Sequence, residues 1–396
     1  RLTTGIIIPW SHLGWLMDGR VQRAETGIAI PKGFQTNLST VMSLHCVDGS
    51  GSTDGPAVHV RVLIVTVIEI ASRRPPMLPM LIGMLASAHG SMVGAAAAAV
   101  GTTYRALVAD GVGDSFRDVA KVVTLPVPEL AADEVLVKVV YAGVNGGCET
   151  FRARGEFAFA QNRETADGFA LGAEGVGVVA AIGTDVESIA LGDAVCFVGS
   201  GFAEYTKAKA GMLWKVPQAT GEMAALRISA LTACAMIELT GKVRAGETVL
   251  VTAAAGGAGH FAVQLAKLAG CTVIGTCSSA EKALALCKLG CDHIINHKTK
   301  DVGAALQKIA PSGVDVAFEG VGGTMLQTAL DHLKEDGRLL QVGYISEYPH
   351  NPDREAQSAS HELEASSLFW KSETITRGKQ TIYGNAWPKD FGAVAS

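Results

Sequence analysis

Small residues gather at one point of the chain, where a buried strand is expected to end and a helix to begin. The segment VLVTAAAGGAGHFAVQLAKLAG, residues 249–270, carries Ala253, Gly256 and Gly259 at AxxGxxG spacing. A dinucleotide-binding turn needs little side chain at three such positions, for the tight turn, for the approach of the pyrophosphate and for helix–strand packing. Small residues also occur at such junctions for packing alone. The strand–turn–helix setting favours the nucleotide.

Hydroxyl groups and a cation follow the next expected strand, in GTCSSAEK at residues 275–282. An NAD-binding unit carries an acid there, about 20 residues beyond the turn, for the ribose 2′-hydroxyl. Here the strand ends at Cys277, Ser278 and Ser279 without an acid, and Lys282 follows. Hydroxyl groups and an ammonium suit a 2′-phosphate. We therefore expect NADPH as the cofactor, with an ordinary solvated helix residue as the alternative reading of Lys282.

Strands alternate with helices from about residue 227, and this order must position both groups. Expected strands are 247–254, 271–278, 291–297, 313–323 and 338–346, and expected helices are 258–270, 280–290, 301–311 and 324–337. On the first helix Phe261, Leu265 and Leu268 share one face. This alternation predicts a doubly wound parallel sheet, an α/β fold. A polar segment follows residue 346, with one further strand expected in 375–387.

Residues 103–220 have the period of short strands. In EVLVKVVYAGVN, residues 134–145, Val135, Val137, Val139 and Tyr141 fall on one face, and glycines separate the strands. We expect a β-rich, barrel-like domain here. Residues 1–101 lack a steady alternation of elements and are interpreted as a leader or a poorly ordered extension, with a transit peptide as the alternative.

The amino-acid composition favours some classes of protein and excludes others. Hydrophobic residues make up 48% of the 396 residues, charged residues 18%, and the net charge is -5, which favours a globular chain and gives no basic excess for nucleic acid. No apolar run reaches the roughly 18 residues of a membrane span. The 8 cysteines form no CxxC pair, so we expect a reducing compartment, cytoplasmic or the lumen of a mitochondrion, plastid or peroxisome.

Several motifs together resemble one family. AGVN (142–145), LGAEGVGVVAAIG (171–183), GDAV (192–195), GFAEY (201–205), SALTA (229–233), VTAAAGGAG, GTCSS and FEGVGG are similar to medium-chain dehydrogenases/reductases over about 60% of the chain. The resemblance is closest to the quinone-oxidoreductase branch and, within it, to the prostaglandin reductases. It implies a GroES-like catalytic domain at 102–225 and a Rossmann domain at 226–350. Residues 351–396 are interpreted as a lid-like segment and a truncated return to the catalytic domain.

The same resemblance bears on zinc. Zinc-dependent members have Gly-His-Glu where this chain has Gly172, Ala173 and Glu174. Ala173 offers no lone pair, and no group of four closely spaced cysteines exists for a structural zinc. Cys148 and Glu149 lie near the place of the first ligand, but two ligands do not make a catalytic site. We therefore predict no metal.

Without zinc, the resemblance implies hydride transfer from NADPH to the double bond of an α,β-unsaturated ketone or quinone, with 15-oxoprostaglandin-like enones as one substrate class. The developing enolate oxygen then needs hydrogen-bond donors. The expected catalytic residues are Asn145 and Tyr344, Asn145 having a turn-forming role as its alternative. The expected cofactor-binding residues are Thr232, Ala255, Gly256, Gly257, Ala258, Gly259, Ser278, Ser279, Lys282, His297, Gly322, Gly343, Tyr344 and Ser346.

Three departures from the family pattern leave alternatives open. His297 stands where relatives have a Tyr near the adenosine phosphate. GVNGGCETFRARG, residues 143–155, is one residue longer than usual, so that Glu149 is the substitute for a displaced acid. Fewer than 50 residues follow Ser346, and a catalytically weak or inactive NADPH-binding protein is therefore the alternative function. A zinc alcohol dehydrogenase is a third. A homodimer through an edge of the Rossmann sheet is also implied.

Overall fold

The chain forms two compact units in a computed structural model that describes residues 6–9, 21–25, 39–46, 58–63, 100–113, 115–154, 169–348 and 374–384. One unit comprises Arg1–Thr66 and Met84–Arg227, and the other comprises Val67–Gly83 and Ile228–Ser396. No helix of the described ranges is both long and apolar enough to cross a membrane.

The first unit is built from antiparallel strands, as its alternating sequence predicts. One sheet has the order β1-β7-β9-β10-β12 with β11 also on β7, and a smaller one has the order β6-β5-β8. Its elements beyond residue 100 are β5 (Thr103–Ala109), α3 (Phe116–Val119), β6 (Ala120–Pro126), β7 (Glu134–Val144), α4 (Gly146–Ala153), β8 (Phe169–Ala170), β9 (Glu174–Ile182), β10 (Ala194–Val198), β11 (Tyr205–Lys209), η2 (Ala210–Met212), β12 (Trp214–Lys215) and α5 (Gly221–Ala224).

Alternate residues of β7 form the core of this unit. Val135, Val137 and Val139 are buried together with Val179 and Phe197 of neighbouring strands, so the predicted alternation is confirmed for these three positions. Tyr141 is only half-buried. The register between β7 and β9 shifts between Val139 and Tyr141, and this irregularity ends the simple alternation.

Four strands lie in the range interpreted from sequence as a leader. β1 (Ile6–Pro9) pairs antiparallel with β7. β2 (Val21–Glu25), β3 (Ser39–Cys46) and β4 (Val58–Leu63) form a three-stranded sheet. The remaining residues before residue 100 lie outside the described ranges.

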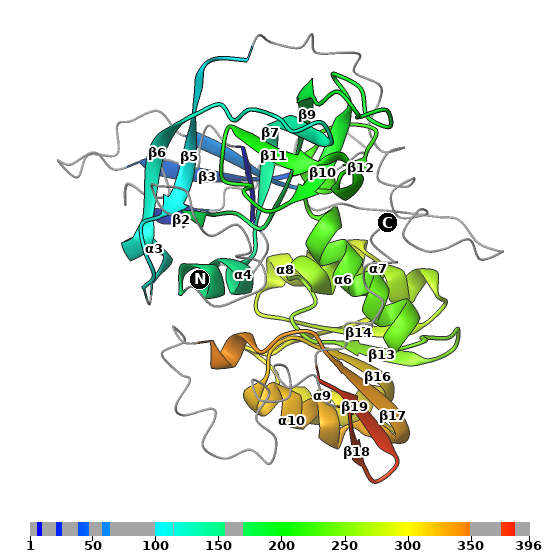
Figure 1. The fold of residues 1–396 in the computed structure, drawn as a ribbon. Coiled ribbons are helices and arrows are strands. Elements are labelled where there is room, and N and C mark those ends of the chain that lie inside the picture. The colour runs from blue at the N-terminus through cyan, green and yellow to red at the C-terminus, as the bar shows by residue number, and fades with distance from the viewer. Residues whose placement is uncertain are drawn as a thin grey trace, which may run out of the picture. The chain divides into compact units, whose positions relative to one another are not determined.

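The second unit contains a seven-stranded sheet of order β15-β14-β13-β16-β17-β19-β18. All its neighbouring strands pair in parallel except β18, which is antiparallel to β19. Helices α7 and α8 lie on one face of the sheet and α9 and α10 on the other (Figure 1). The predicted α/β fold class, a β-rich part plus a doubly wound parallel sheet, is confirmed.

The elements of this unit follow the predicted alternation closely. They are η3 (Leu226–Ala230), which begins in the first unit, α6 (Leu231–Cys234), η4 (Ala235–Thr240), β13 (Thr248–Val251), α7 (Gly257–Leu268), β14 (Thr272–Cys277), α8 (Ala280–Lys288), β15 (His293–Asn296), α9 (Val302–Ile309), β16 (Val314–Glu319), α10 (Gly323–Asp331), β17 (Leu333–Gln341), η5 (Ile345–Glu347), β18 (Thr374–Arg377) and β19 (Gln380–Tyr383). Of the three residues predicted to share one face of α7, Phe261 and Leu265 are buried and Leu268 is half-buried.

Two boundaries differ from the sequence-based prediction. The helix expected at 324–337 ends at Asp331, because Leu333 already pairs with Val314 of β16 and an irregularity carries the chain to the next pair, Val316 with Arg338. The single strand expected within 375–387 is a hairpin, in which β18 turns at Gly378 into β19. Most of the segment predicted as lid-like, 351–396, lies outside the described residues, which include only 374–384 of it.

Candidate functional site

The backbone of the turn after β13 requires small residues. Ala253 adopts a φ of 45°, and Gly256 is the N-cap of α7 without a side-chain cap. A Cβ added to Gly259 would lie 2.5 Å from the Ala253 carbonyl oxygen and 2.9 Å from the Ala254 Cα. The third small position of AxxGxxG must therefore be glycine, because the helix packs directly on the turn.

The start of α7 suits an anionic phosphate group. Gly256, Gly257, Ala258 and Gly259 form the cap and first turn, which contains no acidic residue. The helix has 12 residues, so its N–H groups and dipole present positive potential at this end. Burial lowers the pKa of His260, whose Nδ1 lies 2.9 Å from the Gly256 carbonyl oxygen. These residues fit the pyrophosphate of a dinucleotide.

A polar group lies at the adjoining tips of β14 and β15. The Lys282 Nζ donates to the Ser278 Oγ at 3.4 Å. His297 is joined to β14 by its backbone N–H, which donates to the Cys277 carbonyl at 3.0 Å. Burial and then the charges of Lys298 and Lys282 lower the pKa of His297. The structure thus brings Ser278, Lys282 and His297 together, and they fit a 2′-phosphate, whose charge would offset that repulsion.

The Ser279 hydroxyl caps the start of α8, whereas the Ser278 hydroxyl accepts from the Lys282 Nζ. Its Oγ accepts from the Lys282 N–H at 3.3 Å as the N-cap of α8, and it donates to the Glu281 carboxylate at 3.3 Å. Its hydroxyl is therefore committed to the helix start, which sequence reasoning did not anticipate.

In the second glycine turn, GVGG at 320–323, backbone N–H groups donate hydrogen bonds to the carboxylates of two acids. Glu319 at the end of β16 accepts from the N–H groups of Val321 and Gly322, and Glu347 accepts from Gly323. Both acids are buried. Gly322 has a φ of 79°, which suits its glycine. Sequence reasoning named Gly322 but missed Glu319 and Glu347, although an acid at the end of a buried apolar strand is a usable signal.

The segment after β17 lies against this turn. A Cβ on Gly343 would stand 3.3 Å from the Gly320 carbonyl oxygen. The Ser346 hydroxyl donates to the Val321 carbonyl at 2.6 Å. Tyr344 is 3% exposed, and its ring meets Tyr348 edge-on with centroids 4.9 Å apart. Thr232, also named from sequence, is buried in α6.

In the first unit, Asn145 follows β7 and is fixed by a buried acid. Its Nδ2 donates to the Glu174 Oε1 at 2.8 Å. Gly143 makes room for this acid, because a Cβ there would lie 2.7 Å from the Glu174 Cγ. Arg227, packed over the Trp214 ring at 4.1 Å, has an attractive electrostatic interaction with Glu174. The amide of Asn145 is thus held at the end of a strand.

The positions related to zinc ligands do not fit a zinc ion. Ala173 is buried, the Glu174 carboxylate is engaged with Asn145, and the Glu149 Oε2 accepts from the Gly172 N–H at 3.3 Å. Within the described ranges, no group of three or more His, Cys, Asp or Glu side chains is placed to hold a metal. The sequence-based expectation of no metal stays a prediction for metal analysis.

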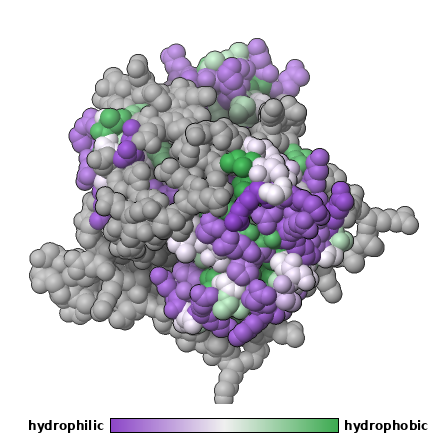
Figure 2. All heavy atoms as spheres, turned by 90° about the horizontal axis from the view of Figure 1, so that it is seen from below, coloured by the Kyte–Doolittle hydropathy of each residue, from purple (hydrophilic) through white to green (hydrophobic). Residues whose placement is uncertain are grey.

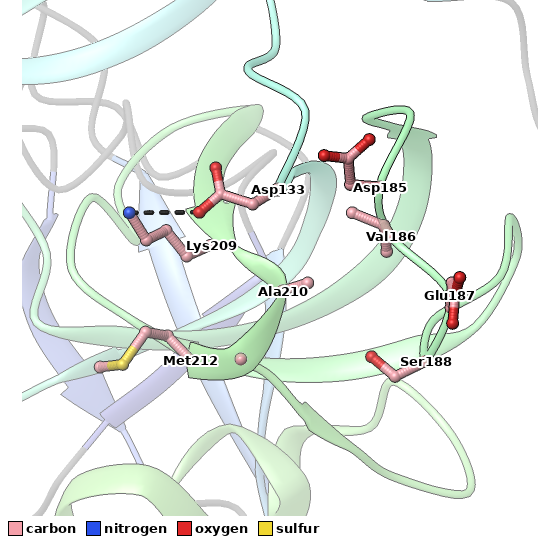
Figure 3. Close-up of a pocket in the computed structure, with 9 residues that line it drawn as sticks. Asp133, Asp185, Val186, Glu187, Ser188, Lys209, Ala210 and Met212 are labelled. Atoms are coloured by element: carbon pink, nitrogen blue, oxygen red, sulfur yellow. Dashed lines mark ion pairs between the residues drawn. The ribbon is translucent and has the colours of Figure 1, made fainter.

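A pocket elsewhere in the first unit has a volume of about 390 Å³ and is lined by loops that include Asp133, Asp185 and Glu187. There, Lys209 pairs with Asp133 at 3.2 Å (Figure 3). None of the site residues predicted from the sequence lines this pocket.

The face of the molecule in Figure 2 is mainly hydrophilic among the described residues, with small separate hydrophobic areas.

The fold consists of a unit with a mainly parallel, Rossmann-like sheet and a β-rich unit, and comparison with known proteins agrees. Residues 131–218 match the model of the alcohol dehydrogenase GroES-like domain, and residues 257–391 match that of the zinc-binding dehydrogenase. A protein of Leishmania amazonensis with the name "Probable quinone oxidoreductase" is 40% identical over 62% of this chain and 72% of its own length. Prostaglandin reductase-3 of Mus musculus is 39% identical over 63% of this chain and 66% of its own.

Solved structures show the same fold. A quinone oxidoreductase of Pseudomonas syringae pv. tomato has a TM-score of 0.58 at 25% identity, covering 74% of this chain and 83% of that one. A mycobacterial protein complexed with NADPH has a TM-score of 0.56 at 26% identity, covering 74% and 87%. The chain therefore belongs to the medium-chain dehydrogenase/reductase family, in its quinone-oxidoreductase-type branch, and is an oxidoreductase. Binding of NADPH is a property of this family.

Proposed function

We propose that the protein is an NADPH-dependent, zinc-independent reductase of the double bond of α,β-unsaturated ketones or quinones. The observation that carries the cofactor choice is the group of Ser278, Lys282 and His297 at the tips of β14 and β15, with the Lys282 Nζ 3.4 Å from the Ser278 Oγ. The names of the relatives support the substrate class. An enone resembling a 15-oxoprostaglandin is the finer proposal, supported by the similarity to prostaglandin reductase-3.

Residues of the second unit would bind and orient the cofactor. The backbone of the turn and the first residues of α7, from Ala255 to Gly259, would receive the pyrophosphate. The side chains of Ser278, Lys282 and His297 would receive the 2′-phosphate. Gly322, Gly343 and Ser346 belong to the turns beside it, and Thr232 is assigned to the same site. When bound, NADPH supplies the hydride.

Asn145 and Tyr344 are the proposed groups at the reacting atoms. One N–H of the Asn145 amide is taken by Glu174, so the second N–H is the one assigned to the substrate oxygen. A donor aimed at a developing enolate oxygen stabilises the transition state more than the ground state. Tyr344 is assigned as an aromatic contact or hydroxyl donor, and the final proton comes from solvent.

The test is a steady-state assay of the purified protein with NADPH and with NADH against a panel of enones and quinones. We expect turnover with NADPH and at least a tenfold preference over NADH, a difference of about 1.4 kcal/mol. Binding of NADPH with thermal stabilisation but without turnover of any panel member would favour the alternative, a non-catalytic NADPH-binding protein. Stoichiometric zinc by elemental analysis would overturn the zinc-independent mechanism.

The homodimer is a separate proposal, supported only by the family. The sheet of the second unit has an outer strand at each end, β15 and β18. Light scattering across a dilution series tests it, and a monomer mass at all concentrations would contradict it.

A further inference from the structure

A buried carboxylate at the second glycine turn has no part in the function proposed above. Glu319 ends β16 and has 0% of its surface exposed. Its Oε1 accepts from the Val321 N–H at 2.8 Å, and its Oε2 accepts from the Gly322 N–H at 3.1 Å. Burial raises the pKa of Glu319 to about 7 against the effect of these bonds. A buried acid is costly unless its oxygens are hydrogen-bonded, and here both oxygens of Glu319 accept from backbone N–H groups.

The neighbouring N–H groups of the turn are also taken by side chains. The Gly323 N–H donates to the Glu347 Oε1 at 2.9 Å, and the Gly320 N–H donates to the Thr252 Oγ1 at 3.0 Å. All four successive N–H groups of residues 320–323 therefore have acceptors within the protein. A phosphate of the cofactor finds no donor here, in contrast to the start of α7, which has no side-chain cap.

These bonds join the tips of three strands. Thr252 directly follows β13 and opens the pyrophosphate turn, and its hydroxyl donates to the Glu319 Oε1 at 3.2 Å. Beyond β17, the Ser346 N–H and hydroxyl donate to the Val321 carbonyl at 2.8 and 2.6 Å. The turn that Glu319 holds thus lies between the pyrophosphate turn and the segment after β17 that contains Tyr344.

We propose that Glu319 is a positioning residue for the dinucleotide, which fixes the distance between the pyrophosphate turn and the 343–347 segment before the cofactor binds. The proposal rests on the proposed function. A preformed site loses less conformational entropy on binding, so a loosened turn appears as weaker affinity. Glu319 touches neither reacting atom in this scheme, and its loss raises KM for NADPH more than it lowers kcat.

The experiment measures the Kd of NADPH by fluorescence titration for wild type, Glu319→Ala, Glu319→Gln and Thr252→Val. The matched control is Glu247→Gln. It weakens the 2.8 Å pair with Arg338 at the opposite, amino end of the same sheet, and so destabilises the unit without touching the turn. Amide hydrogen exchange of residues 320–323 is followed in the cofactor-free protein, and kcat and KM are measured for each active variant.

We expect Glu319→Ala to raise the Kd at least tenfold and to speed exchange at Val321 and Gly322, with Glu319→Gln restoring most of the affinity because it keeps an acceptor. The Kd of Thr252→Val should lie between those of Glu319→Ala and Glu319→Gln. If Glu319→Ala does not fold, the Kd of Thr252→Val tests the proposal in its place. Equal Kd values for Thr252→Val, the Glu319 variants and Glu247→Gln would overturn the proposal. Failure of the wild type to bind NADPH would instead refute the proposed function.

Discussion

The Asn145 amide and the Glu174 carboxylate form a hydrogen bond of 2.8 Å inside the β-rich unit. Glu174 is 1% exposed and pairs across the sheet with Gly143, two residues before Asn145. The strand pairing and the hydrogen bond together fix where the amide lies. In this protein the Glu174 carboxylate therefore accepts a hydrogen bond from the Asn145 amide, and the neighbouring residue is Ala173, which cannot ligate a metal.

Replacing Asn145 tests its proposed role as a donor. We expect Asn145→Ala to lower kcat/KM for an enone by about a hundredfold, the usual cost of removing one donor to a developing oxyanion. NADPH affinity should change little. Glu174→Gln keeps an acceptor for the amide and serves as the control, with activity expected to remain within about threefold of wild type. Full activity of Asn145→Ala in steady-state assays would remove Asn145 from the mechanism.

The Lys282 side chain should determine the preference of the protein for NADPH over NADH. We expect Lys282→Ala to weaken NADPH binding roughly tenfold to a hundredfold, the worth of a hydrogen bond to a charged group, and to leave NADH binding unchanged. Lys288→Ala, on the exposed face of the same helix, is the matched control. Titration of each variant with both cofactors measures the ratio. A parallel loss for NADPH and NADH would show that Lys282 does not face the 2′-phosphate.

Gly259 tests the packing of α7 on the pyrophosphate turn. We expect Gly259→Ala to destabilise the unit by about 1–3 kcal/mol, because its Cβ has no space and the turn must shift. The control is Gly303→Ala in α9, where the nearest atom to an added Cβ belongs to a side chain, the His332 ring, and lies farther away at 3.3 Å. Urea unfolding with and without NADPH reports both stability and binding. Equal midpoints for the two variants would be inconsistent with the close contact.

The sequence predicted the alternation of strands and helices, because buried strands and amphipathic helices have different periods in the positions of their apolar residues. It also located the pyrophosphate turn, since the need for small residues is local. The boundary between α10 and β17 was not predictable, because it depends on the pairing of Leu333 with Val314 in another strand. Local patterns contain no information on such long-range pairing.

The candidate site was predictable only where residues adjacent in sequence act together. Ser278 and Lys282 are four residues apart and meet, as their spacing suggests. Ser346 was named as a cofactor contact, yet its hydroxyl is used by the Val321 carbonyl, 25 residues away in the chain. The contact of Glu319 with Thr252 was not predictable for the same reason. Thr252 lies 67 residues earlier and reaches Glu319 only because β13 and β16 are neighbours.

Glu319 should also make the stability of the protein depend on pH. Its pKa is raised from 4.5 to about 7 in the fold, chiefly by burial and also by the charge of Glu347. The folded state therefore favours the neutral acid, whose contribution is full below pH 4.5 and is lost as the pH rises through about 7. Over this window the free energy of unfolding should fall by on the order of 3 kcal/mol relative to Glu319→Gln, which cannot ionise.

The comparison with Glu319→Gln cancels the other titrating groups, because the two proteins share them. Urea unfolding at half-unit steps between pH 4.5 and 8 gives the free energy of unfolding for each. We expect the two curves to converge or cross toward alkaline pH, with wild type relatively more stable at acid pH. Parallel curves across the window would mean that the Glu319 carboxyl ionises as it does in the unfolded chain, and that its N–H partners fully compensate for burial.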